Sequence, residues 1–198
     1  MVEYNADFVF TDGIYPDYES FKNNKPIEKS RIVSSIDPED MQFFDKLTEQ
    51  KTISVYDGLG NTQTLKTEEL KGYCSGGSVY IFHNGYFNRV GVIGAICHFL
   101  GSKTYYYPSN AYPGYGYGSY GMYTPGLSAE TELQQYIMIF ETGDILEYNS
   151  KSLGFALMTD PLLHDEFSEL SGKKKNARLF LYVRKFNEKH PVKIPVYE

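Results

Sequence analysis

Apolar and polar residues alternate along the middle of the chain, and this period of two predicts β-strands. Three pairs of such segments are separated by short turns that contain glycine, which predicts three β-hairpins. The clearest turn is Asn84-Gly85, because both residues accept the positive φ angles of a type I′ turn. The predicted hairpins pair residues 78–83 with 86–90, 137–141 with 144–148, and 52–56 with 62–65.

The first hairpin is followed by an apolar run over residues 91–99. This run predicts one continuous buried strand, in which Gly91 and Gly94 allow a bend or a bulge. Extended to residues 90–100, it is also the longest apolar stretch of the chain. A membrane-spanning helix needs roughly 20 apolar residues, so no membrane span is expected.

Toward the C-terminus the spacing of apolar residues changes to that of helices. Asp160 is a good N-cap and Pro161 a good first residue for a helix that we expect to end at Gly172. A longer helix is predicted over residues 174–189. Its apolar side is formed by Leu179, Val183 and Phe186.

Shorter helices are predicted at residues 150–158, 38–47 and 17–23. Hairpins followed by clustered helices indicate an α+β fold, with an antiparallel sheet built from β-hairpins and the helices gathered at the C-terminal end. The length of 198 residues fits one large domain, so we expect residues 1–198 to form a single α+β domain.

The composition is that of a globular protein, with 41% hydrophobic and 22% charged residues. The net charge of −6 makes nucleic acid an improbable main partner, since phosphate repels an acidic surface. Lysines and arginines gather between residues 173 and 189, where a solvated helix face is the favoured interpretation and a polyanion site the alternative.

Tyrosine is unusually common, with 19 copies against 13 of phenylalanine and none of tryptophan. Many of them fall in the Tyr/Gly/Pro-rich residues 104–126, which we predict to be a long surface loop. Its tyrosines are the candidate binding residues, since tyrosine buries apolar area at low entropic cost. The alternative is that the rings cover the domain's own sheet. The candidates are Tyr105, Tyr106, Tyr107, Tyr112, Tyr115, Tyr117, Tyr120 and Tyr123.

Three residues are weak catalytic candidates. Cys74 lies in Gly72-Tyr73-Cys74-Ser75-Gly76, which matches a nucleophile elbow with cysteine in the serine position but lacks the following helix. A turn that enters a strand is the favoured interpretation. Cys97 and His98 are neighbours in a predicted strand and therefore point to opposite faces. Two free thiols are preferred over a bond between Cys74 and Cys97, which export would permit.

The sequence contains no motif for binding a metal, a dinucleotide or a phosphate group. The four histidines lack metal-ligand spacing. Gly58-Leu59-Gly60 lacks the third glycine and the helix of a dinucleotide site, and no lysine with Ser or Thr follows a glycine run. We therefore expect no metal and no cofactor.

Several segments are familiar in their order and spacing. They are Asp12-Gly13-Ile14-Tyr15, residues 18–26, Gly72-Tyr73-Cys74, Val79-Tyr80-Ile81, residues 87–99, residues 136–148 and residues 184–191. Together they resemble a family of uncharacterised, typically exported bacterial proteins. The resemblance implies a protein of the periplasm or cell envelope and carries over no catalytic residue. Residues 1–4 show no leader, so we expect the leader to be missing from this sequence.

These observations favour a non-enzymatic binding or structural module of the bacterial cell envelope. Its partner would be an unidentified protein or surface ligand, held by the tyrosine-rich segment. The alternative is a hydrolase or transferase that depends on one of the cysteines and a histidine.

Overall fold

The computed structural model describes residues 1–108 and 127–196. Its centre is an antiparallel sheet in which seven strands lie in the order β11-β10-β9-β8-β7-β6-β2. The strands are β2 (Gly13–Tyr15), β6 (Gly72–Ser75), β7 (Ser78–His83), β8 (Tyr86–Val92), β9 (Ile96–Pro108), β10 (Leu127–Ile139) and β11 (Ile145–Glu147). The helices cluster toward the C-terminus, so the fold is α+β as predicted.

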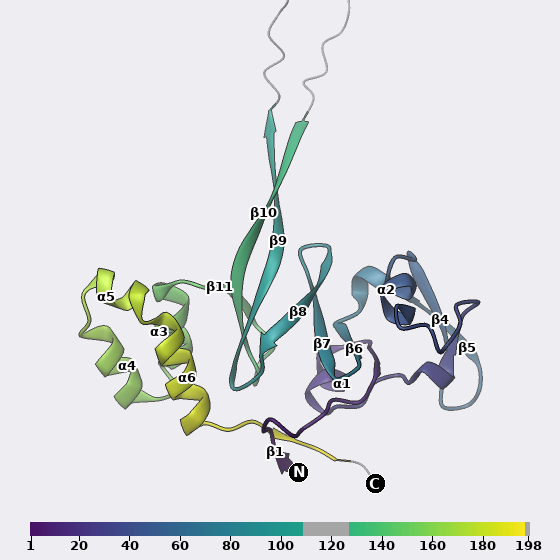
Figure 1. The fold of residues 1–198 in the computed structure, drawn as a ribbon, viewed down its shortest axis with the longest axis horizontal. Helices are drawn as coiled ribbons and strands as arrows, with labels where there is room; N and C mark the ends of the chain where they lie inside the picture. The colour runs from purple at the N-terminus through teal and green to yellow at the C-terminus, as the bar shows by residue number, and fades with distance from the viewer. Residues whose placement is uncertain (109–126, 197–198) are drawn as a thin grey trace, which may run out of the picture.

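All three predicted hairpins are present. β7 and β8 are joined by Asn84 and Gly85, whose φ angles of 54° and 85° are those that the turn requires. β10 pairs with β11. The third hairpin joins β4 (Thr52–Tyr56) to β5 (Thr62–Lys66) in a separate sheet with β3 (Ile32–Val33). A further short pair, β1 (Val2–Glu3) and β12 (Lys193–Ile194), brings the two ends of the described chain together (Figure 1).

The prediction of one strand over residues 91–99 is wrong. β8 ends at Val92 and β9 begins at Ile96, and the two are antiparallel neighbours. The turn between them is held from the far end of the chain, because Asn187 accepts the Ile96 N–H at 2.7 Å and donates to its carbonyl at 2.9 Å. A side chain at Gly94 would overlap Asn187, so glycine is needed for this close approach.

The helices are α1 (Tyr18–Lys22), α2 (Phe43–Thr48), α3 (Ser150–Leu157), α4 (Pro161–Ser168), α5 (Gly172–Ala177) and α6 (Leu179–Lys189). Single 3₁₀ turns cover Lys29–Arg31 and Thr67–Glu69. Asp160 caps α4 by accepting the Leu163 N–H, as predicted.

Three helix boundaries differ from the prediction. The expected helix over 174–189 is two helices, because Arg178 leaves the helical conformation with φ −118° and ψ 9°. Gly172 begins α5 instead of ending α4. α2 starts late, since the Asp37 and Asp40 carboxylates accept the N–H groups of residues 39 and 42 and hold that segment in turns.

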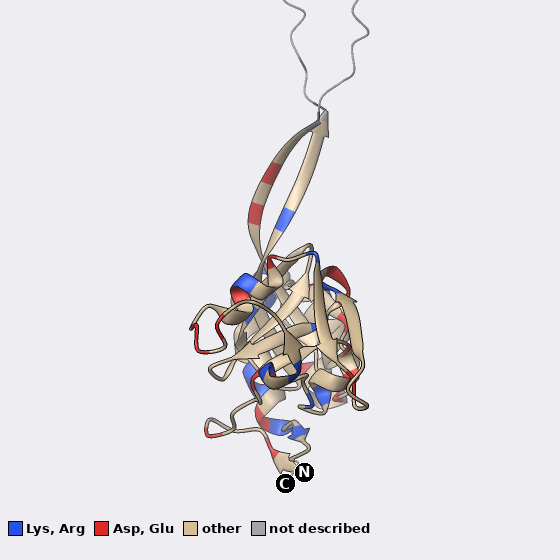
Figure 2. Cartoon of the chain, turned by 90° about the vertical axis from the view of Figure 1, so that its right-hand side faces the viewer, with Lys and Arg blue, Asp and Glu red and all other residues tan. Residues whose placement is uncertain are grey.

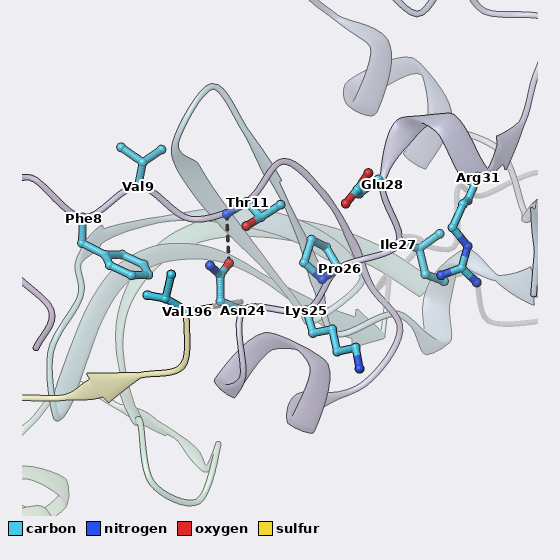
Figure 3. A pocket seen from close by; sticks show the side chains of 10 residues that line it. All are labelled: Phe8, Val9, Thr11, Asn24, Lys25, Pro26, Ile27, Glu28, Arg31 and Val196. Carbon is cyan, nitrogen blue, oxygen red and sulfur yellow. Dashed lines mark hydrogen bonds between the residues drawn. The ribbon is translucent and has the colours of Figure 1, made fainter. Parts of the chain in front are cut away.

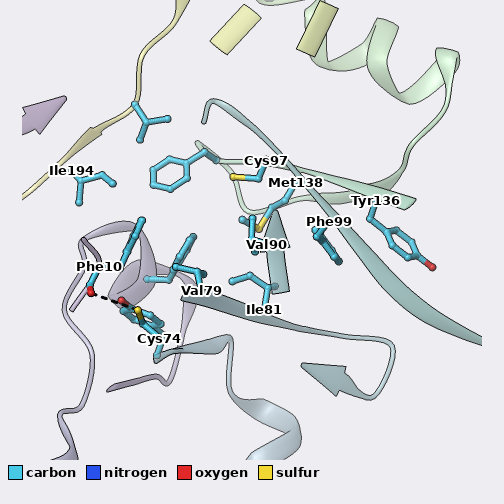
Figure 4. Close-up of a cluster of buried hydrophobic side chains, with 14 residues drawn as sticks. Phe10, Cys74, Val79, Ile81, Val90, Cys97, Phe99, Tyr136, Met138 and Ile194 are labelled. Carbon is cyan, nitrogen blue, oxygen red and sulfur yellow. Dashed lines mark hydrogen bonds between the residues drawn. The ribbon is translucent and has the colours of Figure 1, made fainter. Parts of the chain in front are cut away.

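The sheet is covered on its two faces by different parts of the chain. On one face α3, α4 and α6 form a cluster in which Leu179, Val183 and Phe186 of α6 are buried together with Ile96 and Ile137 of the sheet. On the other lies a cluster built from the N-terminal segment and the central strands (Figure 4). A third cluster joins α2 to the β3–β5 sheet.

β9 and β10 continue far past their neighbours. β8 pairs with β9 no further than Phe99, and β11 pairs with β10 only at 136–138. We call the remainder the arm: residues 100–108 of β9 and 127–135 of β10. The arm projects from the body in both views (Figures 1 and 2). The predicted loop over 104–126 is therefore wrong at its start, because residues 104–108 are strand, whereas β10 begins at Leu127, directly after the predicted end.

Candidate functional site: the arm

The register of the arm sorts its side chains onto two faces. Residues directly opposite each other in an antiparallel pair share a face, and successive residues alternate. One face, which we call the charged face, carries Lys103, Tyr105, Tyr107, Glu130 and Glu132. The other, which we call the neutral face, carries Leu100, Ser102, Thr104, Tyr106, Ala129, Thr131, Leu133 and Gln135. Among the arm residues all charge thus lies on one face.

On the charged face a row of contacts follows β9. Lys103 Nζ lies 2.7 Å from Glu147 Oε1 and 5.2 Å from the centre of the Tyr105 ring. The Tyr105 and Tyr107 rings stack with centres 6.4 Å apart. The hydrogen bond to Glu147 raises the pKa of Lys103, and the same bond lowers the pKa of Glu147. The charged and aromatic side chains along β9 on this face therefore already contact one another or Glu147.

Tyr136 ties the base of this row to the body. Its ring stacks on Phe99 and covers Gly101, where an added Cβ would lie 3.1 Å from the ring. Its hydroxyl accepts a hydrogen bond from the Asn84 amide at 3.0 Å. The arm is thus fixed at its root by a buried aromatic ring and by the turn of the neighbouring hairpin.

The neutral face leaves large apolar side chains in solvent. Tyr106 is 68% exposed, Leu133 75% and Leu100 55%. Near the centre, the Thr104 and Thr131 hydroxyls form a hydrogen bond to each other at 2.9 Å. Leu100 and Leu133 are diagonal neighbours on this face, and Tyr106 lies beyond the threonine pair. Several exposed apolar side chains on one face, unlike scattered single ones, are typical of interaction sites.

His98 lies at the base of the neutral face. Its Nε2 is 3.0 Å from Gln135 Oε1, and its ring lies edge-on to Tyr148 and to Phe180 of α6. Phe180 is half-exposed and extends the neutral face onto the helices. His98 is therefore a structural member of this surface.

The structure places the tyrosine candidates on the arm only in part. Tyr106 lies on the neutral face, whereas Tyr105 and Tyr107 lie on the charged face. Tyr112, Tyr115, Tyr117, Tyr120 and Tyr123 lie outside the described residues. Sequence reasoning missed Leu100, Leu133 and Phe180. The alternation of residues 128–134 was the available signal, since charged or amide side chains at 130, 132 and 134 alternate with less polar ones.

The catalytic candidates are not brought together. Cys74 lies inside β6 and not in a turn, so that interpretation is corrected. Its strand pairs with β2 and β7 and is next to the edge strand of the sheet. Both thiols are buried and free, and burial raises the pKa of each to about 12. Cys97 points into the cluster of Figure 4, while the ring contacts of His98 lie on the other face. A thiolate nucleophile is not supported in this setting.

A surface hollow next to the N-terminal segment offers no alternative centre. It measures about 680 Å³ and lies between the N-terminal segment and residues 24–31 (Figure 3). The Asn24 amide oxygen accepts the Thr11 N–H there, and Arg31 donates to the Tyr56 carbonyl. Among the residues drawn in Figure 3, Glu28 is the only carboxylate and no histidine or cysteine is present. This set of side chains does not favour acid–base or nucleophilic chemistry.

Within residues 1–108 and 127–196, no group of three potential metal ligands is found, and no helix is long and apolar enough to cross a membrane. Comparison with family models, with curated proteins and with solved structures gave no match. The functional argument therefore rests on the chain's own residues.

Proposed function

We propose that the chain is a non-enzymatic binding module of the bacterial cell envelope that holds a partner through the arm. The observation that carries the proposal is the neutral face, on which Leu100, Tyr106 and Leu133 project into solvent from a ribbon that stands clear of the body. An isolated two-stranded ribbon is marginally stable in water, so burying this face against a partner is favourable. The assignment to the envelope rests on the resemblance to exported bacterial proteins.

The test uses washed bacterial cell-envelope fragments as the probe. The full chain is co-sedimented with the fragments as wild type and as the double variant Tyr106→Ser, Leu133→Ser. Both side chains are largely exposed, so the fold should be kept and the thermal unfolding midpoint should be unchanged. We expect binding to weaken at least about tenfold, as for the loss of two central apolar contacts in an interface.

The matched control is Tyr56→Ser, Leu59→Ser, which removes one tyrosine and one leucine from exposed positions of the remote β4–β5 hairpin. This variant should bind as wild type does. Equal binding by the arm variant and the control would contradict the proposal.

A further inference from the structure

β9 has a free edge along the arm. β8 pairs with β9 only at His98 and Phe99 and then turns away to pair with β7. Within the described residues, no strand pairs with residues 100–108 on the β8 side, although Asn88 of β8 still lies close to Gly101. In an antiparallel ladder every second residue directs its N–H and C=O away from its partner strand. A row of backbone donors and acceptors therefore faces outward from β9.

The two edges of the arm differ in charge. β10 carries Glu130 and Glu132, and charged side chains on an edge strand oppose the addition of another strand. The arm part of β9 carries a single charged residue, Lys103, which is already paired with Glu147. The edge of β9 is thus the less protected one.

A hollow of about 540 Å³ lies against this free edge. One wall is formed by Lys103, Thr104 and Tyr106 of β9, and the other by the Asn84–Tyr86 turn of the β7–β8 hairpin. The turn is held in place, because the buried Asn88 amide donates to the carbonyl of residue 86 at 2.8 Å. The space beside the edge is therefore formed before anything binds.

We infer that one extended segment of a different protein adds to the edge of β9 as a strand, lying in this hollow between the arm and the Asn84–Tyr86 turn. This inference rests on the proposed function and names the partner class. A polypeptide alone supplies N–H and C=O groups at the spacing of the β9 edge, and such strand addition is a common mode of peptide recognition. An apolar or aromatic side chain of the segment fits between Tyr86, which is half-exposed, and the more exposed Tyr106.

The same geometry argues against a second copy of this chain. Two copies joined by their β9 edges would each place their own β10 one strand further out. That position is where the Asn84–Tyr86 turn stands in the described structure. The hollow therefore suits a single strand and not a two-stranded ribbon.

The experiment begins with random peptides displayed on phage and selected on the immobilised full chain. The selected peptide is then tested against chains that carry the photo-cross-linker p-benzoylphenylalanine at Tyr86, at Tyr106 or, as the matched control, at Tyr56. We expect cross-linking from Tyr86 and Tyr106 and none from Tyr56. Hydrogen exchange should show new protection at every second amide of residues 100–107, because only those amides face outward.

Methylation of the peptide nitrogens gives an independent readout. Methyl groups at alternate residues should weaken binding at least about tenfold, whereas those at the intervening residues should have little effect. Three results would overturn the inference: selected peptides that all bind more weakly than about 1 mM, uniform effects of methylation, or concentration-dependent dimers that compete with the peptide. If these occur while Tyr106→Ser, Leu133→Ser still weakens envelope binding, the proposed function stands and only the inference of strand addition at the β9 edge is wrong.

Discussion

Phe186 and Phe180 allow the orientation of α6 to be tested with one kind of substitution. Phe186 is 6% exposed and packs in the cluster between the helices and the sheet, with its ring 4.5 Å from that of His190. Phe180 lies on the same helix but is 52% exposed. Phe186→Ala removes a buried ring and leaves a cavity, so the free energy of unfolding should fall by about 3–5 kcal/mol. Phe180→Ala removes a half-buried ring and should cost roughly 1 kcal/mol.

The free energies are measured by urea denaturation followed by far-UV circular dichroism, since the chain has no tryptophan to report on unfolding. The dependence on urea should be the same in all variants, so that shifts of the midpoint report stability alone. Lys174→Ala, in the exposed part of α5, should change stability by less than about 0.5 kcal/mol. If Phe186→Ala does not fold, Phe186→Leu keeps the test open with an expected cost below about 1.5 kcal/mol. Equal losses at Phe186 and Phe180 would refute the assigned orientation of α6.

Three further outcomes follow from buried groups. Native protein at neutral pH should react slowly with iodoacetamide at Cys74 and Cys97, because burial raises the pKa of both thiols; fast labelling, compared with the urea-unfolded chain, would contradict this. Hydrogen bonds from Lys189 and His190 lower the pKa of Asp160, so its stabilising effect should be full at neutral pH and should fade as the pH falls below about 4. Asp160→Asn should therefore be less stable than wild type at pH 7, with the gap narrowing at low pH in urea titrations. Gly72→Ala should destabilise strongly, since its Cβ would overlap the Tyr80 carbonyl oxygen, whereas Gly58→Ala meets open space; similar melting temperatures would disprove the difference.

Features determined by a few neighbouring residues were predicted correctly. The Asn84-Gly85 turn selects its own backbone conformation, and Asp160 with Pro161 starts α4 as the sequence indicates. The apolar stripe of α6 is also right, although the helix is shorter than expected. In each case the physical cause lies within about one turn of chain, where propensity and capping act.

Features that depend on distant contacts were not predictable. The reversal between β8 and β9 is held by Asn187, which lies 91 residues beyond Ile96 in sequence. Glycine at position 94 fits a bend within one strand as well as a tight turn between two, so the local sequence does not separate these alternatives. The extension of β9 through Tyr105 and Tyr107 was missed for a different reason. Tyrosine and threonine favour strands, but the glycines and prolines further along oppose a regular element, and the sequence alone does not show where the strand stops.

The proposed binding surface depends both on the local sequence pattern and on contacts between distant residues. Once β10 is known to be a strand, the alternation from 128 to 134 places its charges on one face without further structural knowledge. Which edge of the arm is free does not follow from that pattern, because it depends on where β8 leaves β9. That separation occurs after Phe99, beyond which β8 pairs with β7 and no longer with β9. A local pattern thus supplies the neutral face, and the non-local pairing of strands supplies the open edge beside it.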